Sequence, residues 1–167
     1  MRQDGIEPLA LTAYLRALNA PADRPARFAF ADLLAMNRGV LAELAFADVA
    51  ARLPDGADAA FWAAIQAHID LLAEARTWWD VVHGEIVAPI LDGAADICAV
   101  ALARMPDGAW DGGTWAGWLT ALGIDAGHPH AALLYLALTG EESGPPMDRL
   151  LPLLGRARAQ QRLRAVL

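Results

Sequence analysis

The chain has 167 residues, 13 arginines, no lysine and a net charge of −7. This length fits one domain or two small helical subdomains. It also allows a core large enough to be stable without a disulfide or a metal. The single Cys98 excludes an intramolecular disulfide and indicates a reducing compartment. The polar opening resembles no signal peptide, and Asp92 and Asp96 interrupt the best membrane-span candidate. We therefore expect a soluble cytoplasmic protein that does not enter a membrane.

Alanine dominates the apolar residues, whereas valine, isoleucine and threonine are sparse. This composition favours helix over sheet. Hydrophobic periodicity and turn residues together predict an all-α fold of about nine or ten helices.

In the first half of the chain, proline, glycine and aspartate divide the predicted helices. Pro8 lies in the first turn of the first helix, whose apolar face is predicted to carry Leu9, Leu11, Leu15 and Leu18. Asp32 and Asp58 are expected N-caps. The expected helices cover 7–18, 32–44, 46–53 and about 59–75, with a linker over 19–30 and a Trp-Trp segment over 76–83 that ends at Gly84.

The second half is divided in the same way. Helices are expected over about 88–105, over 115–122 with Thr114 as N-cap and Gly123 at the end, and over 131–138 up to Gly140. Residues 144–146, Gly-Pro-Pro, are expected to start a further helix, and Gly155 to separate it from a basic helix that runs to Leu167.

The last 19 residues are basic. They contain five arginines and no acidic residue, whereas residues 1–148 hold the other eight arginines and all 20 acidic residues. Arg158 and Arg162 are four residues apart and share a helix face, while Arg156 and Arg164 point elsewhere. Two interpretations stay open: a surface helix whose arginines complement the helix dipole, or phosphate contacts on an RNA stem-loop.

Other candidate sites receive structural interpretations. Asp125, His128 and His130 could bind zinc, but the four-ligand spacing of known sites is absent, so we expect no metal. Cys98 is expected to be a buried inert thiol. The six tryptophans are expected to pack in the core rather than form a base-stacking platform. His68 and His83 are expected at core or interface positions.

Three motifs near the end of the chain resemble a known family. They are Leu136-Ala-Leu-Thr-Gly140, Gly144-Pro145 and Leu150-Leu-Pro-Leu-Leu-Gly-Arg-Ala-Arg158, supported by the Trp-Trp segment over 76–83 and the tryptophans over 110–118. The combination is similar to the carboxyl-terminal anticodon-binding region of bacterial glutamyl-tRNA synthetases. The resemblance implies a helical-cage fold of two packed helical subdomains. It also implies a connecting-helix remnant over 1–20, a first subdomain over 28–106 and a second over 107–167.

The family's catalytic signatures are missing from this sequence. It has no His-x-Gly-His element, and without lysine it cannot supply a Lys-Met-Ser-Lys-type loop. No phosphate-binding glycine motif is present either. We therefore expect no catalytic residue and no cofactor on this chain, and whether it forms part of an enzyme stays open.

The resemblance also implies an RNA-binding corner. A family arginine that contacts an anticodon base corresponds here to Tyr135, and the family's recognition loop corresponds to Gly144, Pro145 and Met147. The usually basic stretch before this helix reads Ala-Gly-His-Pro-His over 126–130, so binding of the tRNA for glutamate should be weak. The predicted nucleic-acid-binding residues are Tyr135, Gly144, Pro145, Met147, Arg149, Arg156, Arg158 and Arg162.

Two functions follow from these observations. In the first, the chain is a non-catalytic tRNA anticodon-binding module derived from glutamyl-tRNA synthetase. In the second, it is a degenerated stand-alone paralogue that acts as a protein-interaction or regulatory module, or the non-catalytic half of a split synthetase that binds a catalytic domain. The intact Leu-Thr-Gly, Gly-Pro and Leu-Gly-Arg motifs in the last third of the chain favour the first function. The loss of basic residues at 126–130 and at Tyr135 favours the second.

Overall fold

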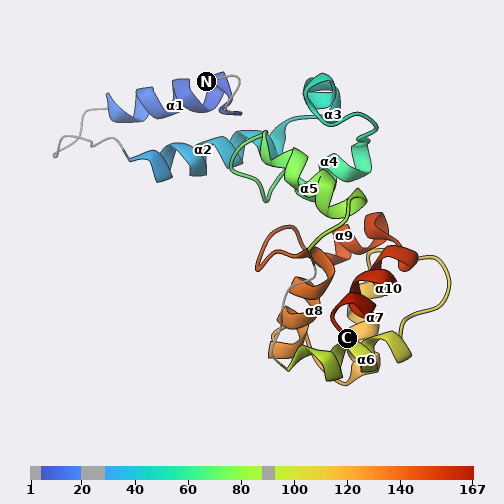
Figure 1. Ribbon diagram of the computed structural model, residues 1–167. Coiled ribbons are helices and arrows are strands. Elements are labelled where there is room, and N and C mark those ends of the chain that lie inside the picture. The colour runs from blue at the N-terminus through green and yellow to red at the C-terminus, as the bar shows by residue number, and fades with distance from the viewer. Residues whose placement is uncertain (1–4, 20–28, 88–92) are drawn as a thin grey trace. The chain divides into compact units, whose positions relative to one another are not determined.

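A computed structural model describes residues 5–19, 29–87 and 93–167. Every regular element in these residues is helical, with ten α-helices and one 3₁₀ turn, which confirms the predicted all-α fold (Figure 1). Most of the expected linker over 19–30 and the expected helix start at 88 lie outside the described residues. The chain divides into two compact units, one up to Trp79 and one from Asp80 onward. None of the described helices is long and apolar enough to cross a membrane.

The first unit opens with two long helices that lie side by side (Figure 1). Helix α1 begins with Pro8, as predicted, and its buried side chains are Ala10 and Tyr14. The Tyr14 hydroxyl accepts a hydrogen bond from Ala29 N–H at 2.7 Å. The predicted leucine face was therefore wrong, because Leu9 and Leu15 are 67% and 49% exposed. The elements of this unit are α1 (Pro8–Leu18), α2 (Phe30–Glu43), α3 (Phe46–Val49), the 3₁₀ turn (Ala50–Arg52), α4 (Ala59–Ile65) and the start of α5 (Glu74–His83).

Two helix starts in this unit had been assigned to aspartates. The Asp58 carboxylate accepts a hydrogen bond from Phe61 N–H at 2.8 Å, so the predicted cap of α4 is confirmed. Asp32 is not an N-cap, because α2 already begins at Phe30 and places Asp32 in its first turn. There the carboxylate still faces the positive end of the helix dipole.

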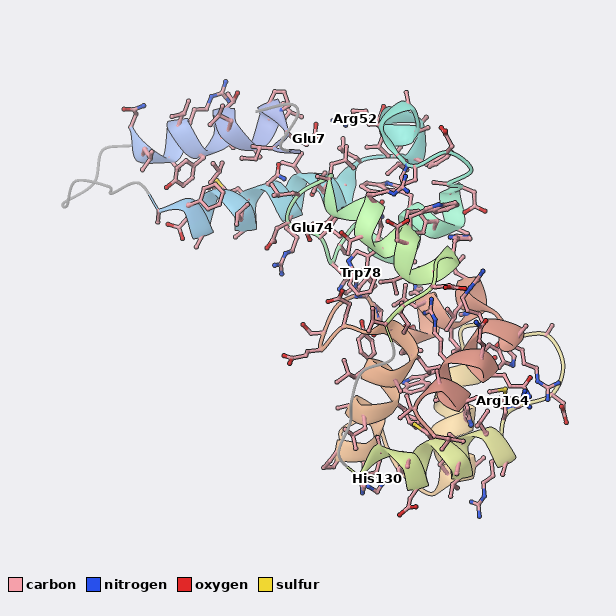
Figure 2. The ribbon with its side chains drawn as sticks, viewed as in Figure 1. Glu7, Arg52, Glu74, Trp78, His130 and Arg164 are labelled. Carbon is pink, nitrogen blue, oxygen red and sulfur yellow. The ribbon has the colours of Figure 1, made fainter. Side chains whose placement is uncertain are left out.

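The buried Asn37 side chain holds three backbone segments of the first unit together. Its Oδ1 accepts from Glu7 N–H at 2.7 Å, and its Nδ2 donates to the carbonyls of Gly5 and Asp70 at 3.1 and 2.6 Å. Gly5 lies so close to the chain that a Cβ there would be 2.7 Å from Leu72 N. An ion pair between Glu7 and Arg52, 2.7 Å apart, adds to this junction (Figure 2).

These contacts explain why the predicted helix over 59–75 was wrong. Helix α4 ends at Ile65, and α5 begins only at Glu74. In between, Leu72 N–H donates to Gly5 O, and the Glu74 carboxylate accepts from Leu71 N–H. A continuous helix would need these backbone groups for its own hydrogen bonds. His68 lies in this break with an exposed side chain, so the core alternative was wrong and the interface alternative stays a prediction.

The second unit contains the carboxyl end of α5 and five further helices. They are α6 (Ala94–Ala103), α7 (Thr114–Leu122), α8 (Pro129–Thr139), α9 (Met147–Leu154) and α10 (Arg156–Ala165). Gly123 and Gly140 end α7 and α8 with φ values of 75° and 76°, and Gly155 ends α9 with φ 73°, as the sequence predicted. Thr114 is the first residue of α7 rather than its N-cap.

Trp118 lies at the centre of this unit. It is fully buried, its Nε1 donates to Ala101 O at 3.2 Å, and the rings of Trp110 and Trp115 lie 5.9 and 6.2 Å from its own. Cys98 is also fully buried, and burial raises the pKa of its thiol. The prediction of core packing is confirmed for Trp118, and the prediction of a buried thiol is confirmed for Cys98.

Candidate nucleic-acid interface

The loop between α8 and α9 forms one wall of a hollow of about 440 Å³. Helix-ending and helix-starting residues determine the path of this loop. Gly140 ends α8, and the proline pair at 145–146 sets the start of α9. Three of the predicted binding residues, Tyr135, Gly144 and Met147, line this hollow. Pro145 lies beside them, because its carbonyl accepts a hydrogen bond from the Tyr135 hydroxyl at 3.1 Å.

The bond from its hydroxyl fixes the Tyr135 ring at its far end. The main-chain carbonyl of Tyr135 accepts from the buried Thr139 hydroxyl at 2.8 Å, and that hydroxyl accepts from Glu141 N–H at 3.1 Å, which ties the start of the loop to α8. Burial and the Glu141 carboxylate raise the pKa of Tyr135 well above its usual value. The hydroxyl is therefore a neutral donor at physiological pH, and the ring presents a preset aromatic wall.

The remaining lining of the hollow is aromatic, small or acidic. Trp115 supplies a second aromatic side chain, and Glu142 and Asp148 supply two exposed carboxylates. No arginine of the described residues lines this hollow. Carboxylates repel phosphate, so these walls suit a flat, uncharged or amino-bearing group better than an RNA backbone.

The two arginines predicted to share a face of α10 do so, but this face is directed into the second unit. Arg162 is 5% exposed, and its guanidinium donates to the carbonyls of Leu138, Val81 and Gly84. Arg158 donates to Val82 O at 2.8 Å and to Leu154 O at 3.3 Å. These carbonyls lie at or next to the carboxyl ends of α5, α8 and α9, where main-chain oxygens have no partner within their own helix.

This arrangement differs from the surface-helix interpretation, because both arginines donate to main-chain oxygens at the carboxyl ends of other helices and Arg162 is buried. Positive charge near carboxyl-terminal carbonyls is favourable, while burial and the nearby Arg158 lower the pKa of Arg162 to about 10. The charge therefore persists at physiological pH inside the protein. Because the Arg162 side chain is enclosed, its geometry argues against direct phosphate contact by this residue.

The other two predicted arginines are exposed. Arg156 forms an ion pair with Asp107 at 2.7 Å, and both side chains are largely in solvent. Such a pair adds little to stability and opens easily. Arg149 lies exposed on α9, next to Asp148 of the hollow. The structure thus brings Tyr135 and the loop residues together but places the arginines of α10 elsewhere.

The histidines before α8 have a local role. His128 is the N-cap of α8, and its Nδ1 accepts from His130 N–H at 3.2 Å. No group of three metal-ligating side chains occurs within the described ranges. His83 at the end of α5 has an exposed side chain, so the core alternative was wrong and the interface alternative stays a prediction.

Sequence reasoning missed several residues that line the hollow, among them Trp115, Glu142 and Asp148. Trp115 had been noted for its spacing within 110–118, but nothing local indicated that α7 reaches the α8–α9 loop. The two acidic residues lie on either side of the segment 143–147 in the sequence. Their adjacency to the glycine-proline motif was the available signal.

Comparison with known proteins gives the family. A glutamate–tRNA ligase 2 of Acidiphilium cryptum is 45% identical over 185 residues, which cover 97% of this chain and 42% of that protein. The corresponding protein of Gluconacetobacter diazotrophicus is 40% identical over 98% of this chain, and a glutamate–tRNA ligase 1 of Rhizorhabdus wittichii is 40% identical over 98%.

No family model matches the chain. The chain spans less than half the length of these relatives, 42% in each case. Their similarity nevertheless extends over nearly all of its own residues, and it agrees with the all-helical structure and with the motifs around Gly140 and Gly155. The chain therefore belongs to the bacterial glutamate–tRNA ligase family and is similar to the carboxyl-terminal part of its members.

Proposed function

We propose that the chain is a tRNA-binding module whose α8–α9 corner takes an unpaired base of the anticodon loop. The observation that carries this proposal is the hollow of about 440 Å³ with Tyr135 and Trp115 among its walls. Single-stranded bases bind proteins by stacking on aromatic rings and by hydrogen bonds at their edges. The fixed Tyr135 ring and the backbone of the Gly144 loop offer both kinds of contact.

The charge distribution predicts that this binding is weak. Glu142 and Asp148 line the hollow, no arginine of the described residues does, and Arg162 is buried. Few guanidiniums therefore lie beside a base bound in the hollow, so the affinity should fall only gently as salt increases. Base contacts rather than backbone contacts would supply the binding energy.

A titration with an anticodon stem-loop of the tRNA for glutamate tests this proposal. We expect saturable binding at low salt, and a five- to hundredfold loss in Tyr135→Ala, since stacking contributes about 1–3 kcal/mol per base. Tyr135→Phe is the matched control, because it keeps the ring and should keep most of the affinity. Absence of saturable binding at low salt would remove the proposal.

A second function is favoured by the apolar surface of the first unit. Leu9, Leu15, Phe30 and Met36 on α1 and α2 are all at least 36% exposed, and exposed apolar residues concentrated on two neighbouring helices are typical of an interaction surface. The relatives are more than twice as long as this chain. The part of these relatives that this sequence does not match is therefore a candidate partner for this α1–α2 hairpin.

This second function has its own test. The part of the A. cryptum ligase that this chain does not match is mixed with the chain, and complex formation is followed by analytical ultracentrifugation. We expect a complex that Leu9→Asp weakens and Leu167→Asp, at an exposed apolar position outside the hairpin, leaves unchanged. No complex at micromolar concentrations would exclude this partner.

A further inference from the structure

A second hollow, of about 360 Å³, lies in the second unit between the end of α5, α8 and α10. It shares no lining residue with the α8–α9 corner. Side chains that line it include those of His83, Glu85, Ala137, Arg158, Gln161 and Arg162. Two arginines, a histidine and a glutamine therefore line one partly open hollow, with a single glutamate among them.

Both guanidiniums are without a carboxylate partner in the described part of the chain. All of the hydrogen bonds made by Arg158 and Arg162 end on main-chain carbonyls. Carbonyl oxygens are dipoles and offset only part of two full charges. Taking a cation out of water without a counter-ion costs free energy. Arg162 is in this situation, because only 5% of its surface is exposed.

Arg158 also has unused donors. Both of its hydrogen bonds start from Nη1, so Nε and Nη2 have no protein acceptor among the described residues. The side chain is half-buried and lines the hollow. A guanidinium edge of this kind matches two oxygens of an oxyanion in a bidentate geometry.

Glu85 opposes anion binding at this place. Its side chain lines the hollow but is exposed to solvent, where water and salt screen its charge. Arg162 and the donor edge of Arg158 are more enclosed than Glu85, so their charges act through a less polar medium.

We propose that this hollow binds a phosphate group through Arg158, with Arg162 providing the second positive charge. Two positive charges match the dianion of inorganic phosphate better than acetate, and the donor edge of Arg158 also fits two oxygens of a singly charged phosphodiester. The site goes beyond the proposed base-binding corner, because it needs no RNA base and lies on other residues. The phosphate can belong to a free small molecule or to an RNA backbone.

Phosphate titration of the intact chain tests the proposal. Inorganic phosphate replaces chloride at constant ionic strength, and binding is followed by ³¹P NMR and by the rise in melting temperature that a native-state ligand causes. We expect saturable binding that sulfate competes for and acetate does not. Unsaturable behaviour, or equal effects of phosphate and acetate, would overturn the site.

Variants locate the binding. Arg158→Gln should weaken phosphate binding about tenfold or more, because it removes a charged bidentate donor. Arg164→Gln removes the same charge from an exposed position of the same helix, labelled in Figure 2, and should leave the affinity within about twofold. Equal losses in the two variants would indicate general charge attraction and contradict the site.

A third variant guards against loss of folding in Arg158→Gln. Glu85→Gln changes an exposed side chain and should bind phosphate more tightly, by up to about fivefold, because it removes a like charge from the rim. Unchanged affinity in Glu85→Gln would count against a phosphate in this hollow. Competition by the anticodon stem-loop then separates the two sources: displacement of phosphate assigns the site to RNA backbone, and simultaneous binding assigns it to a free phosphate. Failure of RNA binding alone would leave the phosphate result standing.

Discussion

Arg158 and Arg162, four residues apart in α10, both donate hydrogen bonds to main-chain oxygens at the carboxyl end of α5, those of Val82 and Val81. Arg162 also donates a hydrogen bond to Leu138 O, at the end of α8. The basic character of the last helix is thus used in part for joining helix ends within the second unit. This assigns the motif after Gly155 a structural role as well as any role in binding.

The first prediction concerns the hydrogen bonds through which Arg162 joins the ends of α5 and α8, here called the joint. Arg162→Met keeps much of the side-chain volume but removes the donors for three carbonyls, so we expect the free energy of unfolding to fall by about 2–4 kcal/mol. Urea unfolding followed by helical circular dichroism measures the loss. Arg164→Met, on the exposed side of α10, should stay within about 0.5 kcal/mol of the parent chain. Similar stability of the two variants would contradict the joint.

The second prediction concerns pH. The folded-state pKa of Tyr135 is raised by burial and by Glu141, whereas an unfolded tyrosine has a pKa of about 10. The folded chain therefore keeps a proton that the unfolded chain loses, so this contribution to stability is complete below pH 10 and declines as the pH rises above it.

Comparison with Tyr135→Phe isolates this effect. The phenylalanine variant should lose about 1 kcal/mol at neutral pH, through the missing bond to Pro145 O. Above pH 10, its stability should approach that of the parent chain. Absorbance at the tyrosinate band should show the corresponding late ionisation only in the parent. A constant stability difference across this pH range would refute the assignment.

The third prediction concerns Asn37. Asn37→Leu leaves Glu7 N–H and Asp70 O without their partner inside the first unit and removes one of the two donors to Gly5 O, so we expect a loss of about 2–4 kcal/mol. Met36→Leu, at the neighbouring and partly exposed position, should change stability by less than about 1 kcal/mol. Hydrogen exchange at Glu7 gives a local measure, since its amide should lose protection only in Asn37→Leu. Retained protection there would show that Asn37 does not hold this segment.

The fourth prediction concerns Cys98. Its thiol is fully buried and its pKa is raised by burial, so little reactive thiolate is exposed in the folded chain. A thiol reagent at pH 8 should modify it at least about a hundredfold more slowly than in urea. Mass spectrometry of the single-cysteine chain follows the reaction directly. Rapid modification of the folded chain would show that α6 opens readily.

The predictable part of the fold came from residues with strong local preferences. Asp58 caps α4, Pro8 opens α1, and Gly140 ends α8 because each residue stabilises that geometry without help from distant segments. The break between Ile65 and Glu74 was missed because it contains neither glycine nor proline. There the deciding partners, Gly5 and Asn37, are more than 30 residues away in sequence.

The candidate site was predictable to a similar degree. The resemblance to the synthetase family implied that Tyr135 and the Gly144–Met147 loop form one corner, and the structure brings Tyr135, Gly144 and Met147 to one hollow. Helical spacing also placed Arg158 and Arg162 on a common face. It could not tell which way this face points, because that depends on where the ends of α5 and α8 lie.

The hydrogen bond that the Tyr135 hydroxyl donates to the loop is accepted by a main-chain oxygen, that of Pro145. Any residue that preserves the path of the backbone can supply such an oxygen. Side chains around the loop can therefore change during evolution, or be redesigned, while the aromatic wall keeps its orientation. The corner can in this way acquire a different ligand preference without a different fold.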